Sequence, residues 1–368
     1  MTRPLDVSPR PPAPASAPLI AVDRAAAELR RGGVVAVRGA DGAVIHALSV
    51  EAVTPETLAR LGAAAEVAVT GRRAAVLGLA ASGDAVQRLS LVGGFDAETI
   101  AALSDPCARD GRPDLAGLTV AAVAAQSGIA GAVALAKLAR LLPAVAFAPA
   151  AAAAPGMLTV DAADIADYQH GAAHSLTIVS QARVPLQDAE NARIVAFRPA
   201  DGGIEHLAIV IGEPDCDAPV LARLHSECFT GDLLGSLRCD CGDQLRGAIA
   251  EISQAGSGVL LYLAQEGRGI GLVNKLRAYQ LQDDGFDTLD ANLQLGFDDD
   301  ERLYQPAAQM LRLLGIGRVR LMTNNPFKVD ALARHGIDVA ERVPHVFPAN
   351  DHNEGYLRTK ATRGGHLF

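Results

Sequence analysis

Three cysteines lie close together in the second half of the sequence. Cys228, Cys239 and Cys241 form the pattern C-x10-C-x-C. Thiolates are preferred ligands of zinc, and a site with three protein ligands leaves one coordination position for a water molecule, whose pKa then falls to about 7. We therefore favour a catalytic zinc site. A structural zinc site closed by His225 and a group of buried, reduced cysteines are the two alternatives that the spacing leaves open.

Two turns near these cysteines have residues that could hold phosphate groups. The segments Glu266-Gly-Arg-Gly-Ile-Gly271 and Leu321-Met-Thr-Asn-Asn-Pro-Phe-Lys328 each join an apolar run to a helical pattern. The N–H groups at the start of a helix, with a nearby cation, favour phosphate. Neither spacing is that of the P-loop or the dinucleotide fingerprint, and glycines after a strand often form only a turn. Combined with the cysteines, the two turns indicate a phosphorylated substrate that reacts at a metal.

A run of four acidic residues precedes an arginine at Phe297-Asp-Asp-Asp-Glu-Arg302. Asp298 and Asp299 are expected to complement the dipole of a helix that starts here. Asp300 and Arg302 are better placed for chemistry, the first as a base and the second as a cation facing phosphate.

Helices and strands alternate around these residues. Predicted helices are 240–255, 271–282, 301–314 and 326–335, and predicted strands are 259–263 and 319–322. In the helix 271–282, the periodicity places Leu272, Leu276 and Tyr279 on one apolar side. The helix 326–335 starts at Pro326 and stops before a glycine, as helices often do.

Length and composition favour two domains. The chain has 368 residues, of which 49% are hydrophobic and 20% charged, whereas a domain has roughly 100–200 residues. In the first half, Ala-rich helical patterns alternate with apolar runs such as 33–37 and 74–79. The predicted fold class is α/β with a mixed (α+β) sheet. We expect a disordered lead-in at 1–18, an α/β domain at 19–147, a linker and joining helix at 148–179, and a catalytic domain at 180–368.

Charge and hydropathy limit the partners. A net charge of −9 argues against a surface that binds nucleic acid through bulk positive charge. The longest apolar stretch, 141–158, contains three prolines and is a poor membrane span. The first 18 residues lack the apolar core of a secretion signal, and the five cysteines are odd in number, so thiol chemistry is favoured over disulfides. We expect a cytoplasmic protein without nucleic-acid or membrane partners.

Residues 180–368 resemble GTP cyclohydrolase II. The resemblance rests on the strings LARLHSECFTGDLLGSLRCDCGDQL, YLAQEGRGIGLVNKLRAYQLQDDGFDTLDANLQLGFDDDER and RVRLMTNNPFKVDALARHGIDVAERVP. It implies an enzyme of riboflavin biosynthesis that converts GTP and water to formate, diphosphate and a diaminopyrimidinone ribosyl phosphate. It also implies one Zn²⁺ per subunit, Mg²⁺ with the GTP phosphates, and a homodimer.

The resemblance also implies roles for individual residues. Cys228, Cys239 and Cys241 would be the zinc ligands. Asp300 would be the proton acceptor, Arg302 the nucleophile or stabiliser at the α-phosphate, and Tyr279 the tyrosine of the ring-opening step. The positions implied to bind GTP are Arg223, Leu224, His225, Ser226, Glu227, Gln244, Glu266, Gly267, Arg268, Thr288, Thr323 and Lys328. Gln244 and Glu227 are suited to reading the guanine edge.

The first domain resembles 3,4-dihydroxy-2-butanone 4-phosphate synthase, through residues 21–37 and 159–168. That synthase holds its metal ions with an acidic Arg-Glu-x-Glu-Gly-Asp loop, whereas this sequence reads Arg38-Gly-Ala-Asp-Gly-Ala-Val44, in which Asp41 is the one acid. A single carboxylate cannot bridge two hard cations and a sugar phosphate. We therefore predict a degenerate, inactive domain that serves dimerisation or stabilisation, with regulation as an alternative.

Three other functions remain open from the sequence. The chain could be a nucleotide sensor that keeps the zinc fold without turnover, although Tyr279, Asp300 and Arg302 argue against this. It could be a zinc-ribbon nucleic-acid module, against which three ligands instead of four and the negative charge both count. It could also be a related enzyme that stops at a formamide product.

Overall fold

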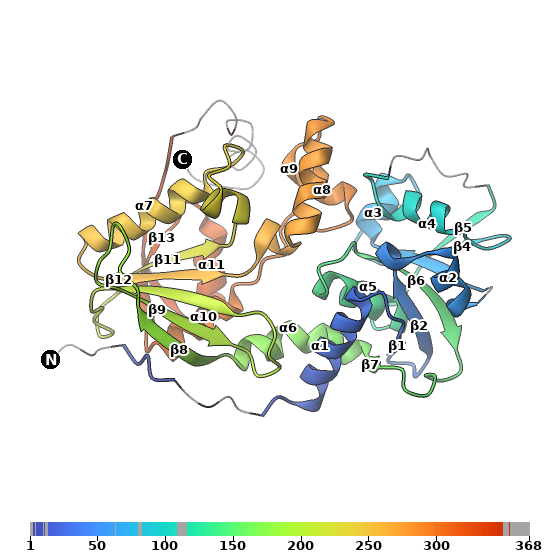
Figure 1. Cartoon of the computed structure of the whole chain (residues 1–368), viewed down its shortest axis with the longest axis horizontal. Coiled ribbons are helices and arrows are strands. Elements are labelled where there is room, and N and C mark those ends of the chain that lie inside the picture. Colours follow the sequence, from blue (N-terminus) through green and yellow to red (C-terminus); the bar gives the residue numbers. More distant parts are fainter. Residues whose placement is uncertain are drawn as a thin grey trace. The chain divides into compact units, whose positions relative to one another are not determined.

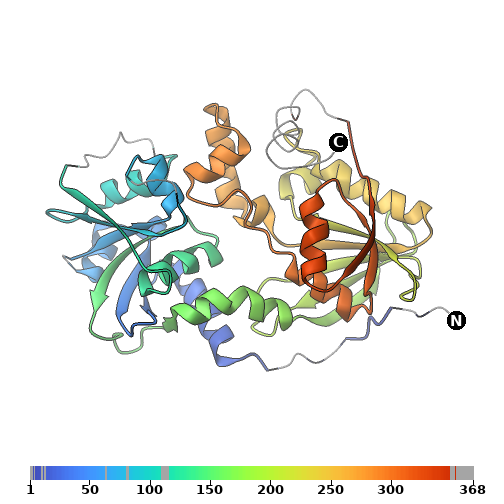
Figure 2. The same ribbon diagram turned by 180° about the vertical axis from the view of Figure 1, so that it is seen from behind.

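The chain folds into two compact units, and the sequence passes between them more than once (Figures 1 and 2). The computed structural model describes residues 3, 5–9, 11, 14–62, 64–79, 83–108, 116–348 and 353. Unit 1 comprises Met1–Ala15, His170–Arg268 and Arg302–Phe368, and unit 2 comprises Ser16–Gln169 and Gly269–Glu301. Within the described residues, each unit is built on a seven-stranded sheet. The predicted mixed α/β class is confirmed.

The sheet of unit 1 has the strand order β14-β13-β11-β12-β10-β9-β8. Its strands are β8 (Thr177–Arg183), β9 (Ala192–Arg198), β10 (His206–Ile211), β11 (Val220–Ser226), β12 (Gly258–Leu263), β13 (Arg318–Met322) and β14 (Asp338–Val343). The four strands β14, β13, β11 and β12 run parallel, and the other neighbours are antiparallel. The carboxyl ends of β11, β12 and β13 therefore meet at one edge, where Ser226 pairs with Leu263.

Helices cover both faces of this sheet. Successive residues of β12 point to opposite faces, so Leu260 packs with Ala248 of α7 (Cys241–Gln254), whereas Leu261 packs with α10 (Gln305–Leu313) and α11 (Pro326–Arg334). The predicted helices 240–255 and 326–335 therefore form with small shifts at their ends.

The helix predicted at 301–314 starts later, at Gln305. Pro306 occupies its first turn, where the missing N–H of proline costs nothing. The expectation that Asp298 and Asp299 complement a helix dipole is therefore wrong, since both lie well before the first turn.

Unit 2 has the strand order β5-β4-β3-β6-β2-β1-β7. Among the strands that the structure describes here, β1 and β7 pair in parallel and all other neighbours are antiparallel. The strands are β1 (Val35–Arg38), β2 (Val44–Ser49), β3 (Glu66–Val69), β4 (Gln87–Leu91), β5 (Leu118–Ala122), β6 (Ala144–Ala150) and β7 (Thr159–Asp161). Side chains from α1 (Ala17–Arg30) and α5 (Gly128–Leu138) form one core cluster with the sheet. A second cluster holds side chains from α2 (Pro55–Leu61) and α4 (Ala97–Ser104).

Two local features of unit 2 differ from the sequence-based expectation. The apolar run 74–79 is not a strand: it lies at the end of α3 (Gly71–Val76) and in the turn that follows, because Thr70 caps a helix here by accepting the N–H of Arg73. The Ala/Pro tract expected as a linker begins inside β6, whose residues up to Ala150 pair with β2. The helix that joins the halves is α6 (Ala162–His174).

Two helices from the later part of the chain belong to unit 2. They are α8 (Leu272–Asp283) and α9 (Thr288–Gln294). The apolar side predicted for α8 is wrong, since Leu276 is exposed and the buried positions include Asn274 and Ala278. Asn274 is tolerated inside because its amide donates to the carbonyls of Arg140 and Ile270, 3.1 and 3.0 Å away.

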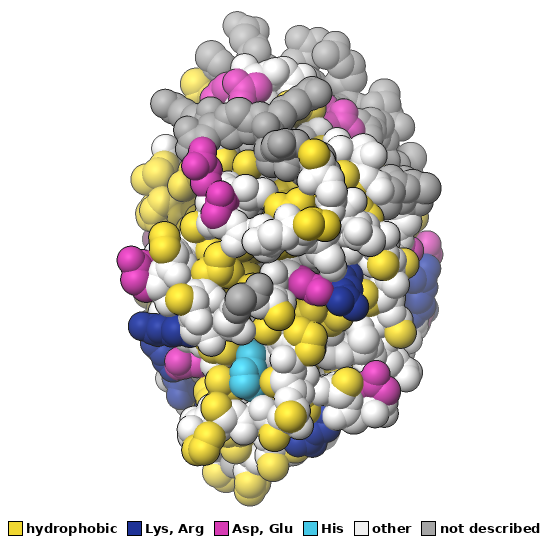
Figure 3. All heavy atoms as spheres, turned by 90° about the vertical axis from the view of Figure 1, so that its right-hand side faces the viewer, with side chains coloured by type: hydrophobic (Ala, Val, Ile, Leu, Met, Phe, Trp, Pro, Cys, Tyr) yellow, Lys and Arg dark blue, Asp and Glu magenta, His cyan; other side chains and the backbone are white. Residues whose placement is uncertain are grey.

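The described residues near the start of the chain pack within unit 1. The Arg3 guanidinium donates to the carbonyl of Gly315 at 2.7 Å, and Leu5 and Val7 pack against the core. No helix in the described ranges has both the length and the apolar character needed to cross a membrane. On the face drawn in Figure 3, basic side chains stand singly among hydrophobic and acidic ones, so no broad basic field lies there.

Candidate metal centre and active site

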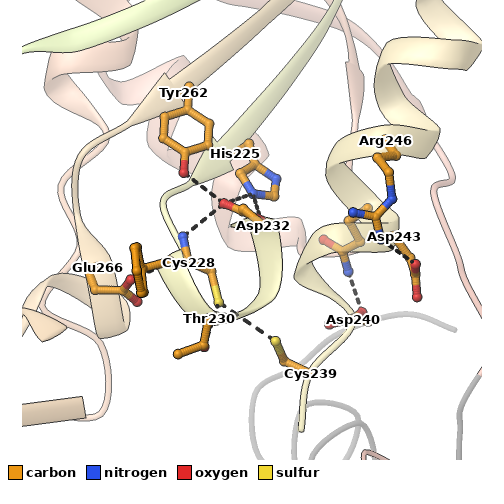
Figure 4. Close-up of polar contacts among 12 residues, drawn as sticks. His225, Cys228, Thr230, Asp232, Cys239, Asp240, Asp243, Arg246, Tyr262 and Glu266 are labelled. Atoms are coloured by element: carbon orange, nitrogen blue, oxygen red, sulfur yellow. Dashed lines mark hydrogen bonds and ion pairs between the residues drawn. The ribbon is translucent and has the colours of Figure 1, made fainter. Parts of the chain in front are cut away.

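The three sulfurs of the cysteine pattern lie together, as their spacing predicts. Figure 4 shows two of them, those of Cys228 and Cys239, facing each other. Cys228 follows the carboxyl end of β11, Cys239 precedes α7, and Cys241 is the first residue of that helix. All three Sγ atoms lie within 4.8 Å of one another, and those of Cys228 and Cys239 are 3.7 Å apart. Across the described residues, this is the one group of three or more ligand side chains close enough to share an ion.

The chemistry of the sulfurs fits a soft divalent cation. A hydrogen bond with Cys228 together with burial raises the pKa of Cys239 to about 11, and the same causes hold the pKa of Cys241 well above its ordinary value. Three sulfurs this close repel one another when ionised, so they lose their protons together only around a cation. Thiolate sets of this kind suit zinc.

The loop after Cys228 approaches the sulfurs closely at Gly231. A β-carbon built there would lie 2.8 Å from the sulfur of Cys239 and 3.1 Å from that of Cys228. Any side chain at this position would therefore push into the group of three sulfurs. Gly231 is required by this close approach and not by a left-handed backbone.

Asp232 organises the other side of the same loop, and the sequence reasoning missed it. Its carboxylate accepts the backbone N–H of Cys228 at 3.0 Å, Nε2–H of His225 at 3.0 Å and the hydroxyl of Tyr262 at 2.9 Å (Figure 4). Its side chain is only 6% exposed. Buried carboxylates with three donors fix the groups around them. An acidic residue four positions after a cysteine is common in protein sequences. The spacing of Asp232 from Cys228 therefore does not indicate this role.

His225 is held by Asp232 and does not offer Nε2 to a metal. A carboxylate only accepts hydrogen bonds, so the neutral imidazole carries its proton on Nε2 and leaves Nδ1 as an acceptor. Burial lowers the pKa of His225, although Asp232 works in the opposite direction. The ring also stacks on Tyr262, with centroids 5.5 Å apart. The alternative of a structural zinc site closed by His225 is not supported, because neither ring nitrogen of His225 belongs to the group of ligand atoms that the three cysteines form.

Arg223 and Gln244, both expected to bind substrate, are hydrogen-bonded to each other. The guanidinium of Arg223 donates to Gln244 and, at 2.9 Å, to the carbonyl of Met322, and Gln244 donates to Asp240. Burial lowers the pKa of Arg223 to about 10. Nε of Arg223 and Oγ of Ser226 are buried without a hydrogen-bond partner within the described part of the chain. Such atoms are rare in folded proteins and are typical of ligand-binding positions.

The loop after β12 is tied to the cysteine loop by Glu266. Its buried carboxylate accepts the N–H of Phe229 at 2.6 Å and of Gly267 at 2.8 Å. Gly267 and Arg268 have left-handed backbones, with φ of 63° and 61°. That conformation strains a residue such as arginine by about 1 kcal/mol or more, and strain of this kind is concentrated at functional sites.

Cations from two other segments lie at the same edge of the sheet. Nζ of Lys328 donates to the carbonyl of Leu224 at 2.8 Å, and Thr323, the residue that follows β13, is buried. The ring of Tyr304 lies 5.9 Å from Nζ of Lys328 and 6.0 Å from the guanidinium carbon of Arg302. Unit 1 therefore groups these cations with the strand ends from which Cys228 and Glu266 follow.

Three of the predicted site residues belong to unit 2. Tyr279 lies on α8 with Nζ of Lys275 5.6 Å from its ring centroid, and Thr288 is the first residue of α9. Asp300 is exposed in the segment after α9. The structure thus divides the predicted site residues: Tyr279, Thr288 and Asp300 fall in unit 2, and the others fall in unit 1.

The fold and the site define an α/β protein with three clustered cysteines, able to hold a metal ion, near the carboxyl ends of parallel strands. The sequence model of GTP cyclohydrolase II matches residues 177–344. A GTP cyclohydrolase-2 of Azospirillum brasilense is 61% identical over 363 residues, which cover 95% of this chain and 94% of the relative. A GTP cyclohydrolase-2 of Pseudomonas paraeruginosa is 54% identical over 194 residues, which cover 53% of this chain and 94% of the relative. The chain belongs to the GTP cyclohydrolase II family of enzymes.

Among solved structures, the chain is similar to a two-domain 3,4-dihydroxy-2-butanone 4-phosphate synthase of A. baumannii. The identity is 16% and the TM-score is 0.33, and the match covers 89% of this chain and 99% of that chain.

Proposed function

We propose that the chain is a zinc-dependent GTP cyclohydrolase of riboflavin biosynthesis, which converts GTP to formate, diphosphate and a diaminopyrimidinone ribosyl phosphate. The observation that carries this proposal is the grouping of three sulfurs in a chain that is 61% identical to a GTP cyclohydrolase-2 along nearly its whole length. A zinc ion bound there would supply Lewis-acid chemistry, which makes water nucleophilic enough at neutral pH to open a purine ring.

In this proposal, residues of unit 1 bind the metal ion and orient the groups around it. Cys228, Cys239 and Cys241 hold the ion, and Asp232 and Glu266 hold the loop that carries the first of them. His225 is kept neutral by burial, so its Nδ1 is able to accept a proton or a hydrogen bond.

Cations and the three unit 2 residues complete the proposed roles. Arg302 and Lys328 would stabilise the negative charge that develops when the bond between the α- and β-phosphates breaks, with Mg²⁺ on the phosphates. Tyr279, Thr288 and Asp300 take the roles that the family resemblance gives them, in ring opening, GTP binding and proton acceptance. The remaining predicted positions, including Gln244 and Arg268, would bind GTP. A homodimer in the cytoplasm is part of the same proposal.

The amino-terminal part is proposed to be inactive as a synthase. The carboxylate of Asp41 accepts the N–H of Ala43 at 3.0 Å within its own turn, and the neighbouring Arg38 pairs with Asp161. This arrangement supports a turn-forming role for Asp41 and gives no acidic cluster for hard cations. Purified protein that formed dihydroxybutanone phosphate from ribulose 5-phosphate would contradict the proposal.

The test is formate release from GTP and Mg²⁺ by the full chain and by Cys239→Ser. The intact chain should release formate, and the variant should lose zinc and formate release together. Mass spectrometry of the product tests the alternative that the reaction stops at a formamide, because that product retains the formyl group. Binding of GTP without any turnover would favour the sensor, and formate release by the zinc-free variant would refute the zinc assignment.

A further inference from the structure

The segment 269–301 lies inside the range that matches GTP cyclohydrolase II, yet it packs with the amino-terminal residues as part of unit 2. Its apolar side chains enter the same core cluster as those of β3, β6 and α4. The contributing residues are Ile270, Ala278, Leu281, Ala291, Leu295 and Phe297. The amino-terminal domain therefore provides the core against which residues 269–301 pack.

Polar contacts from α3 and from its N-cap residue, Thr70, fix the end of α9. The hydroxyl of Thr70 donates to the carbonyl of Gly296 at 2.7 Å, and the guanidinium of Arg73 donates to the carbonyl of Gln294 at 2.9 Å. Both donors are buried. A β-carbon at Gly296 would lie 2.9 Å from Oγ1 of Thr70 and 3.1 Å from Cβ of Arg73, so these two side chains pack directly against the backbone of the glycine.

The next four residues are held at both ends by cations of the amino-terminal domain. Nζ of Lys137, on α5, lies 2.6 Å from the carboxylate of Glu301 and 3.4 Å from that of Asp298. Nε of Arg72, on α3, lies 3.2 Å from the other oxygen of Asp298. The Glu301 carboxylate also accepts the N–H of Asp298 at 3.0 Å, which closes the segment on itself.

Asp300 lies between the two anchored acids and is exposed. Its own side chain is thus presented outward by a backbone whose position Lys137 and Arg72 fix. Although burial opposes ionisation, the charges of Lys137 and Arg72 lower the pKa of Asp298, which keeps this anchor ionised at neutral pH.

The start of the segment is anchored in the same way. The guanidinium of Arg277, on α8, lies 3.1 Å from the carboxylate of Glu51 and 3.3 Å from that of Asp105. Its side chain is 19% exposed, so these pairs are better shielded from solvent than ordinary surface pairs. Both ends of the segment are therefore tied to residues that precede the catalytic domain in the sequence.

From these contacts, and resting on the proposed role of Asp300, we infer that the amino-terminal domain is a scaffold that sets the position of the segment carrying Tyr279, Thr288 and Asp300. Lys137 and Arg72 are positioning residues for Asp300 and do not take part in the chemistry. A domain that has lost the acidic loop of a synthase would thereby keep a role in the GTP reaction.

The test is a pair of substitutions at Lys137 in the full chain, with GTP turnover as the readout. Lys137→Met removes the cation and keeps the length of the side chain, whereas Lys137→Arg keeps both. Lys137→Met should lower kcat roughly 10- to 100-fold, because small displacements of reacting groups cost this much. The KM for GTP should stay within about twofold and the zinc content should not change. Lys137→Arg should restore most of kcat.

A double variant separates positioning of Asp300 from a general loss of structure. If Lys137 acts through Asp300, Lys137→Met should have no further effect on kcat in the Asp300→Asn background. The matched control is Arg88→Met, which breaks a pair with Glu66 between β4 and β3 of the same unit and should leave kcat unchanged. A normal kcat in Lys137→Met, or an equal loss in both backgrounds, would overturn the inference.

Hydrogen exchange distinguishes failure of this inference from failure of the proposed function. Lys137→Met should speed exchange of the amides in 296–301 and leave those of β4 unchanged. If the intact chain releases no formate, or Asp300→Asn is fully active, the proposed function fails while exchange still reports whether Lys137 holds the segment. Unchanged exchange in 296–301 would overturn the scaffold itself.

Discussion

Asp232→Asn is the substitution that probes the metal-binding loop most selectively. Oδ2 of Asp232 accepts from the N–H of Cys228 and from the hydroxyl of Tyr262, and Oδ1 accepts Nε2–H of His225 at 3.0 Å. An asparagine oxygen placed at Oδ2 keeps the first two contacts. Its NH₂ group then faces Nε2–H of His225. Two N–H donors therefore face each other in place of the hydrogen bond that Oδ1 accepts in the wild type.

Two consequences follow from this arrangement. The imidazole of His225 should change tautomer, with the proton moving from Nε2 to Nδ1, because Nε2 can then accept from the asparagine. Replacing a buried charge-assisted network by neutral contacts should lower the free energy of unfolding by about 2 kcal/mol. Since Asp232 orients the backbone of Cys228, zinc affinity should fall about 10- to 100-fold, as it does when supporting groups around metal ligands are removed.

The assay combines two measurements on the full chain. Competition with a chromophoric chelator gives the zinc affinity, and the nitrogen chemical shifts of the labelled imidazole report the tautomer of His225. The matched control is Asp243→Asn on α7, whose carboxylate is 57% exposed and pairs with Arg246, and both quantities should be unchanged there. Wild-type zinc affinity together with an unchanged tautomer in Asp232→Asn would refute the role assigned to this carboxylate.

Three further outcomes are expected. Gly231→Ala should abolish zinc binding, because the added carbon would lie 2.8 Å from the sulfur of Cys239. The control Gly317→Ala, whose added carbon meets nothing within 4 Å, should bind zinc normally. Equal zinc contents of the two variants by atomic absorption would contradict this prediction. Arg302→Ala should keep its zinc and lose at least about tenfold in formate release, and undiminished turnover would remove Arg302 from the active site. The lowered pKa of Asp298 contributes stability that is present above its ordinary value of 3.8 and is lost as pH falls through the folded-state value. Acid unfolding of Lys137→Met should therefore show a weaker pH dependence below about pH 4, and superimposable acid transitions would argue against the ion pair.

The cluster of three cysteines is the part of the candidate site that the sequence predicts best. Cys228, Cys239 and Cys241 are few, close in the chain and chemically distinctive, so their types alone indicate a shared ion. Asp232 could not be found in this way, because acidic residues are common and its role depends on donors brought from β11 and β12. Long-range hydrogen bonds of this kind have no signature in spacing.

Helical periodicity predicts the existence of α8 but not the side that is buried. The pattern favours Leu272 and Leu276, whereas the structure buries Asn274, whose amide finds two carbonyl acceptors, and leaves Leu276 exposed. The partner surface decides which side is covered, and here it comes from residues far earlier in the chain. For the same reason, the assignment of 269–301 to the amino-terminal core is not readable from composition.

X-ray absorption at the zinc edge tests the central claim most directly. In the purified full chain, we expect one zinc per subunit with three sulfur ligands at about 2.3 Å and one oxygen or nitrogen scatterer that GTP or a small anion can replace. A spectrum of four protein ligands that does not respond to substrate, or a protein that turns over GTP without zinc, would contradict the claim.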